Sequence, residues 1–285
     1  MFETSLPGPV AAALESPAAG ERISVQAVGI PFSALVWGDP SARPLLLVHG
    51  VTASAAIWWR VGPALAAMGR WVVAVDLPGH GRTGHWQGHF RFRDNAADVA
   101  EFAREAGLVR DDLQVVGHSW GAMTAAALLA VGLRPATLVL LDPPVLPLAI
   151  IGREVEGSGG RAYADFEEAA AALRAANPAW VEGDVRAKAE ALTQLDEAAA
   201  RSVLLDNGDW DGGLADLADP AAAGIPVWVI RGDPASGSYL PDAAIPAFAA
   251  RIGVDHVDTI AGAPHSPQRT HPVETTAALI RALGG

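Results

Sequence analysis

The sequence predicts an α/β fold: a doubly wound, mostly parallel sheet flanked by helices, with a helical cap inserted into it. Short, continuously apolar runs alternate with longer helical patterns through most of the chain. Strands that are apolar throughout are typical of a parallel sheet covered on both faces, and their alternation with helices indicates βαβ units. With 285 residues, 51% of them hydrophobic, the chain is long enough to bury such a core.

The predicted strands begin with a hairpin and continue as six shorter apolar runs. Arg22–Val28 and Phe32–Trp37 form the hairpin, because Gly29 and Pro31 separate them. The later strands are predicted at Leu45–His49, Trp71–Asp76, Leu113–Gly117, Thr137–Asp142, Val227–Arg231 and His256–Ile260.

Helical patterns occupy the intervals between these strands. They are predicted at Ile57–Met68, Ala96–Ala106, Ser119–Ala130, Ala243–Ile252 and Val273–Leu283. Because strand and helix alternate, we expect an open sheet with helices on both faces.

The interval between Pro143 and Gly224 breaks this alternation. We predict no strand there, but a flexible segment at Gly152–Gly160 and then alanine-rich helices at Phe166–Ala176, Val185–Leu192 and Glu197–Leu205. An interval of this length is too long for a loop. We therefore predict a core of residues 1–142 and 225–285 with a helical cap of residues 143–224; the alternative is a pair of oversized crossovers.

Composition excludes several function classes. Lysine and arginine total 20 against 32 acidic residues, so the net charge of −12 argues against nucleic acid and anionic membranes as partners. The absence of cysteine excludes disulfides, thiolate catalysis and cysteine-based metal sites. We see no basic segment before an apolar stretch and no membrane-length apolar run, and we expect a cytoplasmic protein.

Gly117-His118-Ser119-Trp120-Gly121 is the most specific motif in the sequence. It follows a predicted strand and begins a predicted helix, which is the context of a nucleophile elbow. Flanking glycines permit so tight a turn, and the helix N-terminus favours developing negative charge near the Ser119 hydroxyl. The alternative is that Ser119 only caps the helix.

His49-Gly50-Val51-Thr52 follows an earlier predicted strand. Acyl transfer needs two N–H donors for the developing oxyanion, and the amides of Val51 and Trp120 are the candidates. The alternative is a turn that merely ends the strand. His265, in Gly262-Ala263-Pro264-His265 after the last predicted strand, is the candidate base.

We predict neither a metal nor a cofactor. His80, His85 and His89 lie in one predicted loop. His85 and His89 have the spacing of metal ligands only if they lie on a helix, and the glycines of this loop argue against a helix. The run from Gly79 to Gly84 matches a dinucleotide fingerprint in its glycine spacing, but the helix that should bind the pyrophosphate does not follow it.

Taken in order, these motifs resemble the α/β-hydrolase superfamily: HGVTAS, then Trp58, DLPGHGRTG, GHSWG and GAPH, from about Leu45 to the C-terminus. The resemblance implies an eight-stranded, mostly parallel sheet with a helical cap after the sixth strand. It also implies Ser119 as nucleophile, His265 as base, and the Val51 and Trp120 amides as oxyanion hole. A serine here argues against dehalogenase and epoxide hydrolase activity, because those relatives form an alkyl ester on a carboxylate.

Two aspartates are candidates for the acid that orients His265. In many relatives the acid follows the seventh strand, where this chain has Asp233 two residues early and Ala235 at the expected position. A second group of relatives places it after the sixth strand, where Asp142 stands. Because the offset from Ser119 matches that second group, we predict Asp142, with Asp233 as the alternative.

The predicted activity is hydrolysis of a carboxylic ester or lactone through an acyl-enzyme on Ser119. The alternatives are a C–C bond hydrolase or cofactor-free peroxidase with the same triad, or a ligand receptor that turns over slowly. Trp58 and Trp59 lie close to the predicted active-site loops and are candidate substrate-binding residues. They favour a small, apolar substrate as the partner.

Overall fold

The computed structural model describes residues 6–84, 90–157, 162–218, 222 and 224–284. Its main sheet has eight strands in the order β1-β2-β4-β3-β5-β6-β9-β10. Their bounds are β1 Glu21–Ala27, β2 Ile30–Trp37, β3 Arg43–Val48, β4 Arg70–Val75, β5 Gln114–His118, β6 Thr137–Leu141, β9 Val227–Arg231 and β10 Val257–Thr259.

Only the first two strands interrupt the parallel arrangement. Strands β1 and β2 form the predicted antiparallel hairpin, and β2 pairs antiparallel with β4. Every other pairing, from β4 through β3, β5, β6 and β9 to β10, is parallel. The predicted fold class, a mostly parallel eight-stranded sheet flanked by helices, is therefore confirmed.

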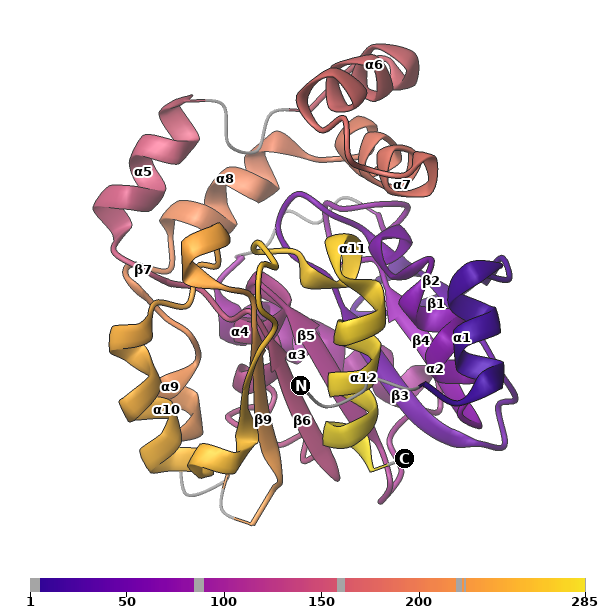
Figure 1. The fold of residues 1–285 in the computed structure, drawn as a ribbon, viewed down its shortest axis with the longest axis vertical. Helices are drawn as coiled ribbons and strands as arrows, with labels where there is room; N and C mark the ends of the chain where they lie inside the picture. The colour runs from indigo at the N-terminus through magenta and orange to yellow at the C-terminus, as the bar shows by residue number, and fades with distance from the viewer. Residues whose placement is uncertain (1–5, 85–89, 158–161, 219–221, 223, 285) are drawn as a thin grey trace.

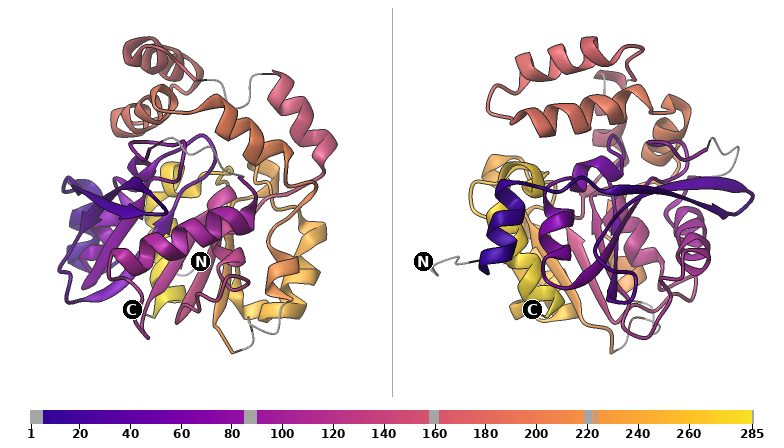
Figure 2. Two further views of the ribbon diagram at one scale, coloured as in Figure 1. Left: turned by 180° about the vertical axis from the view of Figure 1, so that it is seen from behind. Right: turned by 90° about the vertical axis from the view of Figure 1, so that its right-hand side faces the viewer.

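Helices cover both faces of the sheet (Figures 1 and 2). One face carries α1 Gly8–Glu15, α2 Val61–Ala66 and α12 Pro272–Leu283, and the other carries α3 Phe92–Glu105, α4 Trp120–Ala127, α9 Leu214–Leu217 and α10 Ile245–Ile252. In β3, Leu45 and Leu47 pack in the core beneath α12, whereas Leu46 and Val48 pack in the core beneath α4. This double burial explains why the strand is apolar at every position.

The chain between β6 and β9 forms a layer of helices above the carboxyl ends of the strands (Figure 1). It contains α5 Leu148–Gly157, α6 Phe166–Ala176, α7 Glu182–Thr193 and α8 Glu197–Leu205, framed by the strand pair β7 Val145–Leu146 and β8 Trp210–Asp211. Leu192 and Val203 of this layer join the core beneath α4. Within the described ranges, no helix combines the length and apolar character needed to cross a membrane.

Three local predictions were wrong. Most of the predicted flexible segment, up to Gly157, belongs to helix α5, and residues 158–161 lie outside the described part of the chain. The pair β7–β8 occupies the interval predicted to lack strands, since strands of two residues carry no detectable period. The predicted helix Ile57–Met68 is divided into a 3₁₀ helix at Ala55–Trp58 and α2, because Pro63 is tolerated only in the first turn of a helix.

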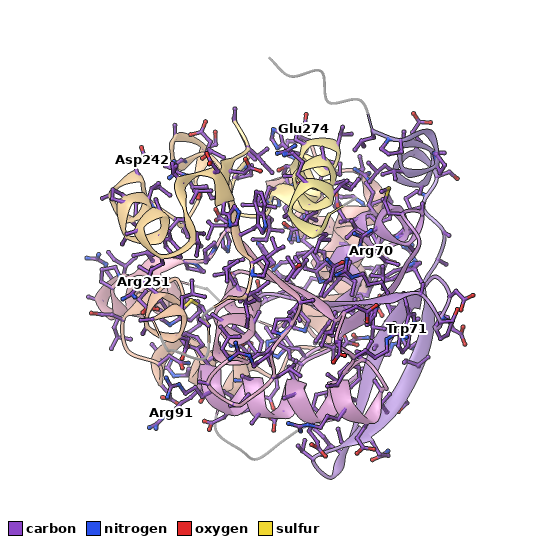
Figure 3. All side chains as sticks on the ribbon, turned by 90° about the horizontal axis from the view of Figure 1, so that it is seen from below. Arg70, Trp71, Arg91, Asp242, Arg251 and Glu274 are labelled. Carbon is purple, nitrogen blue, oxygen red and sulfur yellow. The ribbon has the colours of Figure 1, made fainter. Side chains whose placement is uncertain are left out.

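The amino ends of the parallel strands are joined by a buried cation, Arg70. Its guanidinium donates from Nε to Gln114 Oε1 at 2.9 Å and from Nη2 to the Leu283 carbonyl at 3.0 Å. It therefore ties β4 and β5 to the end of α12. Figure 3 shows this end of the molecule from below, with Arg70 labelled. The carboxyl ends of the strands lie at the opposite end, beneath the layer of helices, and carry the residues singled out by the motifs (Figure 1).

Candidate active site

Ser119 stands on a strained turn between β5 and α4. Its φ of 57° and ψ of −124° are unusual for a residue with a side chain. A Cβ at Gly117 would lie 2.1 Å from the Gly121 carbonyl oxygen, and one at Gly121 would lie 2.5 Å from the carbonyl oxygen of His49. Both glycines are thus required by close backbone contacts, and the predicted strand-turn-helix geometry is present.

The structure brings Ser119, His265 and Asp142 into one hydrogen-bonded chain. The Ser119 hydroxyl lies 2.8 Å from His265 Nε2, and His265 Nδ1 lies 2.6 Å from Asp142 Oδ2. A carboxylate only accepts, so Nδ1 carries the proton and donates it to Asp142, which leaves Nε2 free to accept from Ser119. This is the arrangement that a serine nucleophile and its base require.

Asp142 is completely buried at the end of β6, with a positive φ of 44°. Besides His265, its carboxylate accepts from the Gly232 amide at 2.8 Å, the Tyr239 amide at 3.1 Å and the Ser238 hydroxyl. Burial opposes the charge, but the hydrogen bonds from His265, Ser238 and Gly232 outweigh it and lower the pKa of Asp142 below its ordinary 3.8. Asp142 is thus held as a carboxylate beside His265.

The carboxylate of Asp233, the alternative acid, binds backbone amides and not the His265 ring. Its carboxylate accepts from the Ala235 amide at 2.9 Å and from the Gly262 amide at 3.1 Å, and these bonds lower its pKa. Asp233 therefore caps a short 3₁₀ helix at Pro234–Ser236 and anchors the loop that leads to His265. Among the described residues, its carboxylate forms no hydrogen bond with the imidazole of His265, whose Nδ1 is bonded to Asp142.

The Val51 and Trp120 amides lie on two segments that meet at Ser119. Gly50 passes so close that an added Cβ would lie 3.0 Å from Ser119 Cβ. The ring of buried His49 holds this loop, because Nδ1 donates to the Gly50 carbonyl at 2.8 Å and Nε2 accepts from the Leu77 amide at 3.0 Å. Trp120 is the first residue of α4, where amides have no partner within the helix.

A cavity of about 460 Å³ opens onto Ser119 and His265 beneath the helical layer. Much of its wall is apolar, and both the loops at the ends of the strands and the helical layer contribute to it. These apolar residues are Val51, Ala53, Ile57, Pro144, Leu146, Ile151, Leu192, Leu204 and Trp210. The cavity lies at the carboxyl ends of the strands, where open α/β sheets bind their ligands.

The structure does not place Trp58 and Trp59 on the cavity wall, so their prediction as substrate-binding residues was wrong. Trp58 is fully buried in the core beneath α2 and α12. Trp59 donates from Nε1 to Asp184 at 2.9 Å and packs so closely on α7 that a Cβ at Gly183 would lie 2.3 Å from its ring. The 3₁₀ helix that begins at Ala55 turns both rings away, and Ile57 faces the cavity instead.

Sequence reasoning missed three basic side chains on the cavity wall: His118, Lys188 and Arg269. His118 donates from Nε2 to the His265 carbonyl at 2.8 Å and so holds the His265 loop. Burial, together with nearby His265, lowers the pKa of His118 to about 3, so it stays neutral. Its place inside the elbow motif was the available signal, and for Lys188 the signal was that it is the only lysine in the sequence.

The histidines and glycines of the loop after β4 make contacts within the protein. His80 is buried and donates from Nδ1 to the Pro78 carbonyl at 3.0 Å, while His85 and His89 lie outside the described ranges. Among the described residues, no three side chains of the metal-binding types cluster. In the glycine-rich loop, a Cβ at Gly81 would lie 2.3 Å from the Asp76 carboxylate, which accepts from the Arg82 amide of that loop at 3.1 Å.

The chain is similar to known proteins in both sequence and fold. A family model described as the alpha/beta hydrolase family matches residues 45–279. A fluoroacetate dehalogenase from a Burkholderia species is 31% identical over 148 residues, which are 50% of this chain and 47% of the relative. An esterase from Mycobacterium tuberculosis is 36% identical over 135 residues, 46% of this chain and 40% of the relative. The matches thus cover less than half the length of these curated relatives.

The solved structure of an E-2-(acetamidomethylene)succinate hydrolase is similar over nearly the whole chain. Its TM-score is 0.76 at 21% identity, with 93% of this chain and 100% of that chain covered. At this identity the similarity shows the fold.

The buried histidines predict a loss of stability in acid. Burial lowers the pKa of His49 and of His118 from 6.5 to about 3. Between pH 6.5 and pH 3 these histidines are therefore protonated in the unfolded chain but neutral in the folded protein. The free energy of unfolding should consequently fall steadily as the pH is lowered through this range. Urea unfolding across this range measures the slope.

His49→Gln should make the dependence of the unfolding free energy on pH shallower, because unfolding then takes up about one proton fewer. This change in slope is independent of the effect of the substitution on stability at pH 7. His271→Gln makes the same exchange at a partly exposed histidine that hydrogen-bonds to the Thr270 hydroxyl, and it is the matched control for the substitution itself. An unchanged slope in His49→Gln would show that His49 is not kept neutral in the folded protein.

Proposed function

The chain belongs to the alpha/beta hydrolase family, and we propose that it is a serine hydrolase that cleaves a carboxylic ester or lactone. The observation that carries the proposal is the hydrogen-bonded chain from Ser119 through His265 to the buried Asp142, in which Ser119 and His265 lie on the wall of the cavity. An alcohol is a poor nucleophile at neutral pH, and a positioned imidazole supplies the base that it needs.

In the proposed acylation step, Ser119 Oγ attacks the ester carbonyl carbon while its proton passes to His265 Nε2. The imidazolium that forms is stabilised by the buried Asp142 carboxylate, whose other hydrogen bonds keep it ionised and in place. The carbonyl oxygen becomes an oxyanion and accepts from the amides of Val51 and Trp120. His265 then donates its proton to the leaving alcohol as the carbon–oxygen bond breaks.

In the proposed deacylation step, water takes the place of the alcohol. His265 Nε2 accepts a proton from water as the hydroxide oxygen bonds to the acyl carbon, and the proton returns to Ser119 Oγ when the carboxylic acid leaves. A lactone follows the same course, with its alcohol remaining attached to the acyl group. All the bonds formed and broken use groups of Ser119, His265, water and substrate.

The nucleophile's chemistry separates this proposal from two activities found among the relatives. The curated matches include a fluoroacetate dehalogenase and epoxide hydrolases. Such relatives form an alkyl ester on a carboxylate, whereas this chain has the Ser119 hydroxyl at the elbow. A serine activated by histidine is suited to attack at a carbonyl carbon, with an oxyanion site to receive the charge.

We assign the helical layer of residues 143–224 the role of a cap on the core of residues 1–142 and 225–285. Leu146, Ile151, Leu192 and Leu204 contribute apolar wall to the cavity. A cap of this kind would exclude water from the oxyanion and shape the space around the substrate. The apolar wall supports a substrate with a hydrocarbon portion.

Ser119→Ala should abolish ester turnover, because it removes the attacking oxygen without altering the turn. We expect kcat to fall on the order of 10⁴-fold or more, with a thermal midpoint close to that of the wild type. Hydrolysis of 4-nitrophenyl butyrate, followed at saturating substrate, measures the loss. A variant that retains near-normal kcat would contradict the serine mechanism.

Asp142→Asn and Asp233→Asn form a matched pair, because each exchanges one of the two candidate carboxylates for its isosteric amide. Asp142→Asn should lower kcat on the order of 10⁴-fold, since the amide cannot stabilise the imidazolium in the same way. Asp233→Asn should retain most of the wild-type kcat and change mainly the thermal midpoint. The reverse result, with Asp233→Asn inactive and Asp142→Asn active, would exchange their roles.

A further inference from the structure

Lys188 extends from the helical layer toward the catalytic loops. It is the only lysine in the sequence, in which every other cationic side chain apart from histidine is arginine. It lies on α7 and lines the cavity, where its ammonium donates to the Thr52 carbonyl at 2.6 Å and to the Thr52 hydroxyl. Thr52 directly follows Val51, so the ammonium stands beside the loop of the proposed oxyanion hole, with a third proton to donate.

Arg269 reaches the same cavity from a different element of the fold. It belongs to the short helix α11 Pro267–Thr270, which follows His265. Its guanidinium stacks on the ring of Trp180 at 4.2 Å, a contact that orients the fork of N–H donors. The guanidinium forms no hydrogen bond and no ion pair with any residue in the part of the chain that the structure describes.

No carboxylate on the cavity wall balances these two charges: of the described residues that line it, none is Asp or Glu. The charge of Asp184 acts on Arg269, but Asp184 stands outside the described lining and accepts from Trp59. Burial, together with the charge of Arg269, lowers the pKa of Lys188 to about 7. Burial also lowers the pKa of Arg269 to about 10. An anion between the two would relieve both effects.

We propose that Lys188 and Arg269 form an anion-binding subsite of the catalytic cavity and that the substrate is an ester carrying a carboxylate. This rests on the proposed hydrolase function and adds the substrate class. A guanidinium fork and one ammonium proton match the two oxygens of a carboxylate. The apolar wall formed by Leu146, Ile151, Leu192 and Leu204 would contact the hydrocarbon portion.

The two cations come from different parts of the fold, which gives the subsite a second consequence. Lys188 belongs to the helical layer, and Arg269 follows the His265 loop. A bound carboxylate would therefore link the two elements and hold α7 over the reacting groups. Charge complementarity of this kind selects substrates as well as binding them.

A pair of esters of equal length tests the subsite: 4-nitrophenyl hemiglutarate, which carries a carboxylate, and the neutral 4-nitrophenyl pentanoate. We expect the wild type to have the higher kcat/KM on the hemiglutarate. Lys188→Gln and Arg269→Gln should each lower kcat/KM for that ester roughly 10- to 100-fold, the range for a lost hydrogen bond to a charged group. Their kcat/KM for the pentanoate should change much less.

Arg186→Gln is the matched control. It removes one positive charge from the same helix, but Arg186 is exposed and stacks on Phe166 outside the described lining of the cavity. Its preference for the hemiglutarate should equal that of the wild type. If Lys188→Gln and Arg186→Gln retain the same preference, or if the wild type favours the neutral ester, the subsite is refuted while hydrolysis of either ester leaves the proposed function standing.

A binding measurement separates the subsite from the chemistry. Glutarate, added at tenfold its dissociation constant, should raise the thermal midpoint of Ser119→Ala by about 3 °C. The same glutarate concentration should have no such effect when Lys188→Gln is combined with Ser119→Ala, and the neutral diamide of glutaric acid should have none on either protein. Equal stabilisation of both proteins by glutarate would refute the subsite. If the wild type hydrolyses neither these two esters nor 4-nitrophenyl butyrate, the proposed function fails, and this measurement still decides the subsite.

Discussion

The fully buried carboxylate of Asp142 constrains the whole active end of the sheet. A carboxylate removed from water is stable only when donors surround it, and Asp142 obtains them from the loop after β9 and from the loop that carries His265. Satisfying this one charge therefore draws two loops, distant in sequence, over the end of β6. His265 is thereby positioned with Nε2 toward Ser119, and the strained elbow supplies the hydroxyl at the matching point.

Features with a short-range physical signature could be predicted from the sequence. Leu45 to Val48 are apolar on both faces, so a buried parallel strand followed directly. Gly117 and Gly121 indicated a turn too tight for a Cβ at either position. The order of Ser119 and His265 along the chain fitted the known order of nucleophile and base in α/β hydrolases. The position of Asp142 beside His265 was the preferred one of two alternatives, and the geometry gives Asp233 a separate capping role.

Features set by packing between distant segments could not be predicted in this way. Trp58 and Trp59 lie near the catalytic loops in sequence, but a short 3₁₀ helix directs one into the core and the other onto α7. The two-residue strands β7 and β8 have no periodicity to recognise. Lys188 and Arg269 are far apart along the chain, and only the placement of α7 over the carboxyl ends of the strands brings both onto one cavity wall.

Covalent labelling with a fluorophosphonate tests the central claim most directly, namely that the Asp142–His265 pair makes Ser119 a nucleophile. Peptide mass spectrometry of the wild-type protein after labelling should show one adduct per chain, located on Ser119. Under the same conditions His265→Gln should label far more slowly, because the base is missing. An adduct on another residue, or an unlabelled protein that still hydrolyses esters, would contradict the account.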